Sequence, residues 1–191
     1  MPQESTPARG IQLPSRQLTF ETVARELRRR SFGIISTVAK NGRSQSTGVC
    51  YGVSAPNGPF DIYVMSEPTT VKARNIRSNP NVSFVVPFQR PVLTMVPPAC
   101  VQFQGRAELL GPDDGEGVRA FQSSYLLRML LRQSREFESS GKHSTCFIRI
   151  TPDPVIQTYG VGMSILDLRR HIADASSHVL VPRQLRRNSP G

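Results

Sequence analysis

The sequence predicts a mainly β protein in which a closed antiparallel barrel carries helices on its outside. Two turn signals lead to this prediction. Asn41-Gly42 and Asn57-Gly58 each separate two apolar segments, and Asn-Gly is favoured in tight hairpins. Consecutive strands joined by such turns pair antiparallel, which argues against a doubly wound parallel sheet. With 191 residues, the chain is long enough for one domain with a substantial core.

An amphipathic helix is expected at the start of the domain. Thr19 is a favourable N-cap, and Gly33 is expected to end the helix. Residues 1–17 hold three prolines and little apolar content, so they are predicted to form a flexible N-terminal arm. Apolar residues recur at the i, i+3, i+4, i+7 spacing of a helical face, at Phe20, Val23, Ala24 and Leu27.

Three short strands and a second helix are predicted next. The strands are expected at residues 34–38, 43–54 and 60–65, between the turn signals. The second helix carries Lys72. It is expected to end just before Pro80, because a residue that precedes proline disfavours the helical conformation.

The remaining strands lie on either side of a proline-rich connection and at the end of the domain. Strands are expected at 81–87 and 99–110, with the connection over 89–98 between them. A last strand is expected at 145–151, and residues 154–159 are a candidate extension of the sheet.

One more helix and a tail complete the prediction. Apolar periodicity predicts a single helix from Pro112 through about Arg132, followed by a polar loop over 134–143. Residues 173–191 are polar and basic and are predicted to form a flexible C-terminal tail. The barrel domain is therefore assigned to residues 18–172.

The chain is basic, with a formal net charge of +10 from 24 Lys and Arg against 14 Asp and Glu. This charge is dispersed along the chain and accompanies no nucleic-acid recognition motif, so specific nucleic-acid binding is not expected. Arg128, Arg132 and Arg135 follow i, i+4, i+7 spacing, which is typical of a solvated helix face. An anionic cofactor or substrate is the better explanation of the charge.

Segment composition also limits location and metal binding. No apolar run is long enough to span a bilayer, the N-terminus lacks the pattern of a secretory signal, and a cytoplasmic protein is expected. Cys50, Cys100 and Cys146 lie in apolar segments without a CxxC pair, which indicates buried thiols. The three histidines lie in polar segments without tight ligand spacing, so no metal site is predicted.

Residues 63–77 form the most informative segment. An apolar strand leads into a hydroxyl-rich turn, and the turn opens the short helix that carries Lys72, Arg74 and Arg77. Helix-start N–H groups, Ser and Thr hydroxyls and a lysine together suit a phosphate group. The segment therefore predicts a phosphorylated cofactor, although an ordinary helix start with a solvated lysine would have the same composition.

Three segments of the sequence resemble one known family. They are residues 41–49 (NGRSQSTGV), residues 66–83, which contain KARNIRSNPNVS at 72–83, and residues 101–108 (VQFQGRAE). In this order and spacing they resemble the pyridoxamine-5′-phosphate-oxidase-like flavin-binding split-barrel family. The resemblance covers about residues 30–151, and the run at 72–83 is its most specific part.

The resemblance implies a fold, an assembly and a set of cofactor-binding residues. The fold would be a six-stranded antiparallel split β-barrel of the FMN-binding type, usually a homodimer with two cofactor sites at the interface. The cofactor phosphate would be held by Ser66, Thr70 and Lys72. The residues beside the flavin ring would be Thr47, Gly48, Val49 and Cys50, and those beside the ribityl chain would be Val64 and Met65.

The sequence departs from the oxidase of this family at several positions. Val71 and Thr47 stand where the oxidase has arginines, and Cys100 stands where it has a flavin-contacting glutamine. The chain also has no tryptophan, whereas the oxidase ends in a Trp-containing motif. Oxidation of pyridoxamine phosphate is therefore not expected.

Two functions are compatible with the resemblance. The first is an oxidoreductase that uses FMN or a deazaflavin (coenzyme F-420) on a small organic substrate, with no catalytic acid or base identifiable. The alternative is a non-catalytic protein that binds or sequesters a flavin or haem. A homodimer is the expected state in both cases, and neither requires a membrane or nucleic-acid partner.

Overall fold

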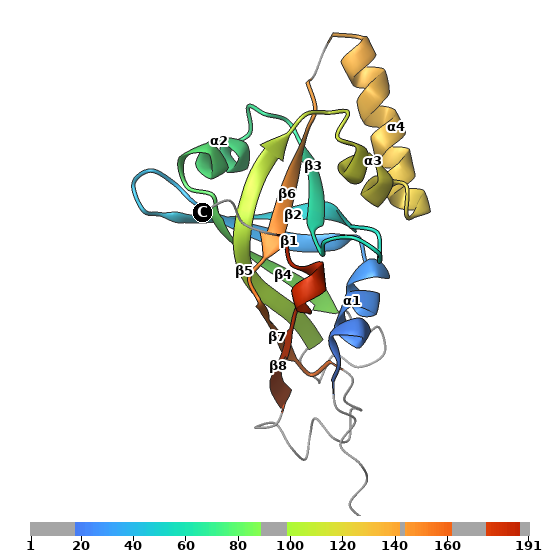
Figure 1. Cartoon of the computed structure of the whole chain (residues 1–191). Coiled ribbons are helices and arrows are strands. Elements are labelled where there is room, and N and C mark those ends of the chain that lie inside the picture. Colours follow the sequence, from blue (N-terminus) through green and yellow to red (C-terminus); the bar gives the residue numbers. More distant parts are fainter. Residues whose placement is uncertain (1–17, 89–98, 142–143, 162–174, 188–191) are drawn as a thin grey trace, which may run out of the picture.

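The computed structural model describes residues 18–88, 99–141, 144–161 and 175–187. The elements in these ranges form a β-barrel with helices on its outside (Figure 1). The strands are β1 (Phe32–Val38), β2 (Ser44–Val53), β3 (Ile62–Ser66), β4 (Asn81–Phe88), β5 (Ala99–Leu110), β6 (Cys146–Pro152), β7 (Val155–Tyr159) and β8 (Ser176–Leu180). The helices are α1 (Phe20–Arg28), α2 (Val71–Ser78), α3 (Gly115–Phe121), α4 (Tyr125–Ser139) and the short 3₁₀ turn η2 (Arg183–Leu185).

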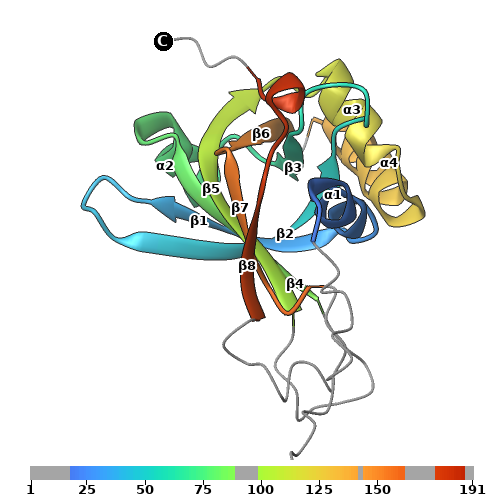
Figure 2. The ribbon, with the colours of Figure 1, turned by 60° about the horizontal axis from the view of Figure 1, so that its bottom comes forward.

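The predicted six-stranded antiparallel barrel is confirmed. The strands are ordered β4-β1-β2-β3-β6-β5, and pairing of β4 with β5 closes the ring. Beyond the barrel, β7 pairs with β5 and β8 pairs with β7, so the candidate extension at 154–159 is also a strand. The two ribbon views place α2 on one side of the barrel and α3 with α4 on the other (Figures 1 and 2).

The barrel interior holds the main core, and α1 closes part of it. Tyr51, Phe84 and Phe103 pack there as an aromatic group, with ring centroids 5.4 Å and 5.6 Å apart for the two contacts. The hydroxyl of Tyr51 donates a hydrogen bond of 2.8 Å to the carbonyl of Leu27, which ties α1 to β2. Gly33 does not end this helix as predicted, because α1 ends four residues before β1 begins and Gly33 lies within β1.

The predicted single helix over 112–132 is two helices. Asp114 caps α3 by accepting from the N–H of Gly117, and Ser124 caps α4 by accepting from the N–H of Leu127. The apolar periodicity concealed this break because both helices bury a face against the same strands. The predicted loop over 134–143 is also wrong at its start, since α4 continues to Ser139.

The described part of the predicted flexible tail, residues 175–187, has a defined structure. The sequence predicts flexibility from residue 173, whereas β8 pairs with β7 and the N–H of Phe60 donates to the carbonyl of Leu185 at 2.8 Å. Val179 and Val181 are buried in the barrel core, being 6% and 2% exposed. Two valines in a largely polar segment are a weak sequence signal for a strand. They stabilise the segment because they are buried against the barrel.

A buried charge network fastens the end of this segment to the barrel. Asp61 is fully buried just before β3, and its carboxylate accepts hydrogen bonds from Thr151 (2.6 Å) and from two nitrogens of Arg187 (2.7 and 3.0 Å). Arg187 also donates to Glu116 at 2.7 Å, as does the hydroxyl of Tyr63 at 2.6 Å. The hydrogen bond from Tyr63 and the nearby Arg187 hold the pKa of Glu116 below its usual range.

Arg187→Ala is expected to destabilise the protein, because it leaves the buried Asp61 carboxylate without its cation. Breaking a buried pair from one side costs up to about 3–5 kcal/mol, and about 2–4 kcal/mol is expected here because Arg187 is 28% exposed. The measurement is the free energy of unfolding from urea titrations. Arg183→Ala, an exposed arginine of the same segment, is the control and is expected to change it by less than about 0.5 kcal/mol. Equal effects of the two changes would contradict the anchoring role.

Candidate functional site

The end of β3 and the start of α2 form a backbone environment suited to an anion. Thr70 is the N-cap of α2, but its hydroxyl donates to the carbonyl of Glu67 at 2.8 Å and makes no capping hydrogen bond to the helix. The first N–H groups of a helix lack intrahelical acceptors and carry the positive end of the helix dipole. These groups at the start of α2 are therefore suited to bind a negatively charged group.

The barrel holds α2 firmly in this position. Ala73 and Ile76 are buried beneath the helix. Asn75 is also buried, and its side-chain amide donates a hydrogen bond of 3.0 Å to the hydroxyl of Thr37 on β1. These contacts explain why the run at 72–83 places an asparagine in the middle of a short helix, where its propensity is poor.

A cavity of about 410 Å³ lies at this helix start. It is enclosed by the end of β3, the turn, the first residues of α2 and one face of α4. Four predicted site residues line it, namely Met65, Ser66, Thr70 and Lys72. The hydroxyls of Ser66 and Thr70 lie 3.1 Å apart.

Lys72 supplies a partly desolvated positive charge to this cavity. Burial lowers the pKa of its ammonium group, whereas the nearby Cys146 and Glu67 act in the opposite direction. Cys146 is opposite Ser66 in the pairing of β3 with β6, and burial raises the pKa of its thiol. Because an ion pair is stronger where water is partly excluded, Lys72 is better placed to bind an anion than a solvated lysine would be.

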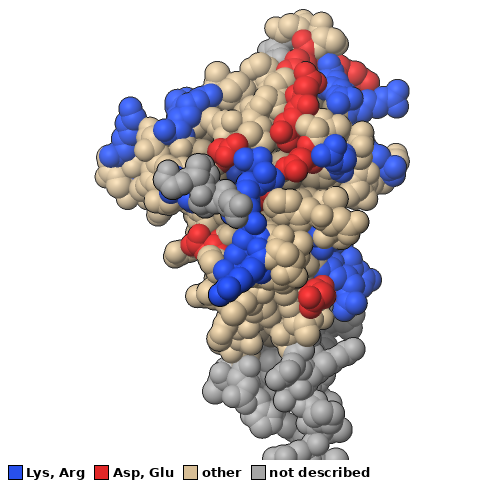
Figure 3. All heavy atoms as spheres, viewed as in Figure 1, with Lys and Arg blue, Asp and Glu red and all other residues tan. Residues whose placement is uncertain are grey.

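Two arginines of α2 stabilise the turn. Arg74 donates to the carbonyl of Thr69 and Arg77 donates to the carbonyl of Pro68, each at 2.7 Å. Both side chains therefore fold back over residues 67–70 and fix their shape. Elsewhere on the surface, basic and acidic side chains are interspersed on the face shown in Figure 3, in agreement with the dispersed charge of the sequence.

The wall that α4 contributes was missed by the sequence analysis. Residues on one face of α4 line the cavity, together with Thr145 just before β6. The cause of the omission is the loop predicted over 134–143. The missed signal was the helical spacing i, i+3, i+4, i+7 of Leu130, Gln133, Ser134 and Phe137.

Tertiary contacts hold this part of α4 in place. The hydroxyls of Ser134 and Thr145 lie 2.6 Å apart, and the N–H of Thr145 donates to the carboxylate of Glu138 at 3.2 Å. Both contacts join the last turns of the helix to the chain that leads into β6.

The predicted ring-binding residues of β2 are divided between the two faces of the strand. Cys50 and Gly48 lie on the outer face, where Cys50 joins the apolar cluster that includes Met65. Gly48 is exposed next to Phe32 on β1, which is 51% exposed. Met65 belongs both to this cluster and to the lining of the cavity at α2, so the outer face at Cys50 adjoins the cavity, whereas the ring of Phe32 lies against Gly48.

Three other predicted residues point away from this face. The side chains of Val49 and Val64 are buried in the barrel core, at 8% and 0% exposure. Thr47 lies on the same face of β2 as Val49 and is half-buried opposite Ile35. A ligand on the outer face would reach only the backbone groups of these three residues.

The described residues also bear on metal binding and on membrane insertion. No group of three or more His, Cys, Asp and Glu within these ranges could hold a metal ion. No helix in the described part of the chain is long and apolar enough to cross a membrane.

Comparison with known proteins supports one family. The family model for "Pyridoxamine 5'-phosphate oxidase" matches residues 19–159. No curated protein shows a significant match to this chain.

Solved structures with the same fold include haem-binding and flavin-binding proteins. A heme binding protein from Mycobacterium smegmatis is 14% identical over 84% of this chain and 56% of its own length, with a TM-score of 0.55. The heme storage protein HutZ from Vibrio cholerae is 18% identical over 76% of this chain and 98% of its own, with a TM-score of 0.55. An FAD-binding protein from Mesorhizobium loti is 20% identical over 74% and 92%, with a TM-score of 0.52. At these identities the comparisons show the fold alone.

The environment of Lys72 gives a test that needs no ligand. Because burial lowers its pKa, Lys72 is expected to lose its proton at a lower pH than an ordinary solvated lysine. Acetylation at a series of pH values, followed by mass spectrometry, measures this property for each lysine. The ordinary pKa of a solvated lysine provides the reference. A titration of Lys72 at or above that value would contradict the partial burial of the ammonium group.

Proposed function

Because the chain belongs to the pyridoxamine 5'-phosphate oxidase family, we propose that it is an oxidoreductase that binds a phosphorylated flavin-type cofactor and acts on a small organic substrate. The family resemblance found in the sequence is confirmed by the match over residues 19–159. The specific activity is our proposal and rests on the candidate site.

The observation that carries the proposal is the cavity at the start of α2. Its residues suit a phosphate group in three ways: helix-start N–H groups without intrahelical acceptors, the paired hydroxyls of Ser66 and Thr70, and the half-buried ammonium group of Lys72. We propose that these three groups hold the cofactor phosphate. Val71, in place of the oxidase's arginine, adds no charge there, so Lys72 is the main cation.

The remainder of the cofactor would lie on the outer face of β2. Met65 lines the cavity at α2 and packs in the same cluster as Cys50. Gly48 continues this face without a side chain, and a bound cofactor ring would take the place of the Phe32 ring that lies against it. A planar ring requires such close approach to backbone. Val49, Val64 and Thr47 would contribute through their backbones. The cofactor, when bound, supplies hydride transfer, and the protein binds and orients it.

Both FMN and a deazaflavin (coenzyme F-420) carry a phosphate that this cavity could hold, and the site residues do not discriminate between them. Oxidation of pyridoxamine phosphate remains disfavoured, because Val71, Thr47 and Cys100 replace the residues that the oxidase uses. Cys100 is half-buried on β5, and burial raises the pKa of its thiol. A neutral thiol lacks the amide donors and acceptor with which a glutamine would contact a flavin.

We also propose that the protein is a homodimer in the cytoplasm. Large apolar side chains are exposed on α4 and β1, where a second subunit would cover them. They are Phe32, Tyr125, Leu126 and Met129, with exposures of 51%, 78%, 42% and 48%. The cytoplasmic location rests on the cysteine usage of the sequence.

A second candidate is a protein that binds haem or flavin without turnover. It is favoured by two of the similar structures, which are named as heme-binding and heme-storage proteins. In the part of the chain that the structure describes, the one histidine is His178, which is exposed on β8. His143 and His171 lie outside the described residues.

Lys72→Ala is expected to weaken cofactor binding by about 1–3 kcal/mol, because it removes a charge-assisted hydrogen bond. Parallel titrations of the purified protein with FMN and with the deazaflavin, followed by fluorescence, measure the affinity. Lys40→Ala removes an equal charge from the exposed β1–β2 turn and is expected to leave the affinity unchanged. Equal affinity of Lys72→Ala and the native protein would remove Lys72 from the site.

Haem titration distinguishes the second candidate. If the protein were a haem carrier, a Soret band would saturate at one haem per subunit, and replacement of a histidine by alanine would abolish it. For the proposed oxidoreductase we expect no saturable Soret band, and we expect the bound flavin-type cofactor to be reduced and reoxidised with a substrate. A saturable band lost in His178→Ala would favour the carrier instead.

A further inference from the structure

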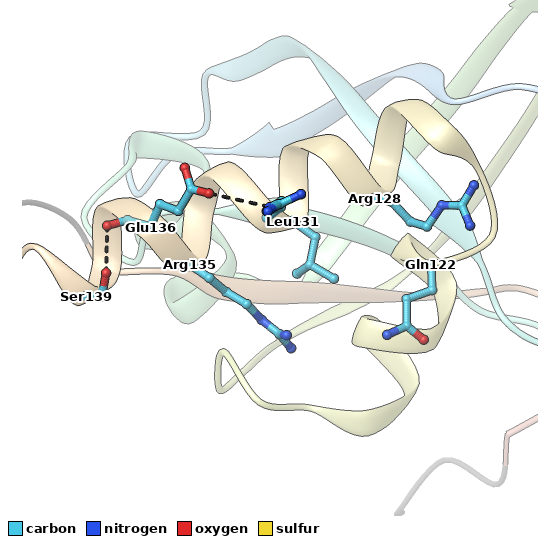
Figure 4. A pocket seen from close by; sticks show the side chains of 7 residues that line it. Gln122, Arg128, Leu131, Arg135, Glu136 and Ser139 are labelled. Carbon is cyan, nitrogen blue, oxygen red and sulfur yellow. Dashed lines mark hydrogen bonds and ion pairs between the residues drawn. The ribbon is translucent and has the colours of Figure 1, made fainter.

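A second cavity, of about 380 Å³, lies on a different face of α4 and has no part in the proposed function. The cavity forms where the helical structure is interrupted between α3 and α4. Gln122, the residue that follows α3, forms one side of it (Figure 4). Its lining residues are Gln122, Arg128, Leu131, Arg132, Arg135, Glu136 and Ser139.

Among the described residues, two of its three arginines have no acidic partner. Glu136 lies 3.6 Å from Arg132 and is already engaged with it. Within the described part of the chain, neither Arg128 nor Arg135 forms an ion pair or a side-chain hydrogen bond. Figure 4 shows Arg135 and Gln122 extending to the same side of α4, with Glu136 on the other side. The cavity therefore has an excess of positive charge.

This arrangement is unfavourable for α4 itself. Arg128 lies in the first turn of the helix, where the helix dipole disfavours a cation. Arg132 is four residues from Arg128 and three from Arg135, and like charges at these spacings repel. The Arg132–Glu136 pair also has its base N-terminal to its acid, which is the weaker orientation. A bound anion would remove this repulsion.

We propose that this cavity binds a small polyanion that carries two or more phosphoryl groups. Guanidinium groups bind phosphoryl oxygens in a bidentate manner. Seven helical residues separate Arg128 from Arg135 by about 10 Å along the axis, so each of these long side chains can hold a different phosphoryl group. Leu131 provides an apolar floor, and Gln122 provides an amide donor.

The test uses inorganic tripolyphosphate as the probe and the full-length chain as the protein. Titration calorimetry is carried out in the Lys72→Ala background, so that the cavity at α2 contributes little. We expect saturable binding of one tripolyphosphate per subunit. Arg128→Gln with Arg135→Gln is expected to weaken it about tenfold or more, since two charge-assisted contacts are lost.

The matched control is Arg25→Gln with Arg29→Gln, which removes the same charge from exposed positions on α1 and at its C-cap. It is expected to change the affinity by less than about twofold. The change at Arg128 and Arg135 is also expected to leave the melting temperature unchanged or higher, because it removes repulsion. A purely structural role of the two arginines would lower the melting temperature and leave tripolyphosphate binding intact.

Other results would overturn the proposal. Equal weakening by the two double changes would show diffuse attraction to a basic protein, and absence of saturation would show that no site exists. Single-stranded oligonucleotides that bind more tightly with increasing length, at the expense of tripolyphosphate, would indicate a nucleic-acid surface.

ATP serves to identify the source of the phosphoryl groups. Equal affinity for ATP and tripolyphosphate would show that the phosphoryl groups alone are recognised. Tighter binding of ATP would show that a nucleoside also contacts Leu131.

Discussion

Closure of the barrel through the pairing of β4 with β5 is the constraint on which the rest of the structure depends. β5 pairs with β4 along one edge, and along the other it pairs first with β7 and then with β6. Gly105 lies where this second edge changes partner, and a Cβ there would overlap the carbonyl oxygen of Thr151. Once β5 satisfies both edges, every strand of the ring has two neighbours, and no barrel edge is left unpaired.

The closed barrel also determines where the candidate site is formed. Pairing of β3 with β6 holds Ser66 opposite Cys146, so the chain leaves the barrel at a defined point and enters α2. Arg74 and Arg77 then fix the turn by binding its carbonyls, and Asn75 fixes the helix against β1. The site is therefore assembled from rigid elements, which reduces the entropy that a bound ligand must remove.

The break between α3 and α4 gives α4 two separate roles. One face of the helix encloses the cavity beside Lys72, and another face forms the arginine-lined cavity. Between them, Leu127 and Leu131 bury the helix against the barrel. The two proposed anion sites would account for much of the net charge of +10 without a nucleic-acid partner.

The class of the fold and a candidate phosphate-binding segment could be predicted from the sequence alone. Antiparallel pairing followed from the Asn-Gly turns. The consecutive strand, hydroxyl-rich turn and helix start predicted a phosphate site near Lys72, and the family resemblance assigned Ser66 and Thr70 to it. Such local patterns depend only on residues that are neighbours in the chain, so they can be recognised in the sequence.

Other features of the fold and of the candidate site could be recognised only from the tertiary structure. Four such features depend on residues far apart in the chain. They are the α4 wall of the cavity beside Lys72, the burial of Val64 in the barrel core, the pairing of β8 with β7, and the ion pair of Asp61 with Arg187. Their stabilities come from burial and from the pairing of distant groups, and the local sequence contains neither.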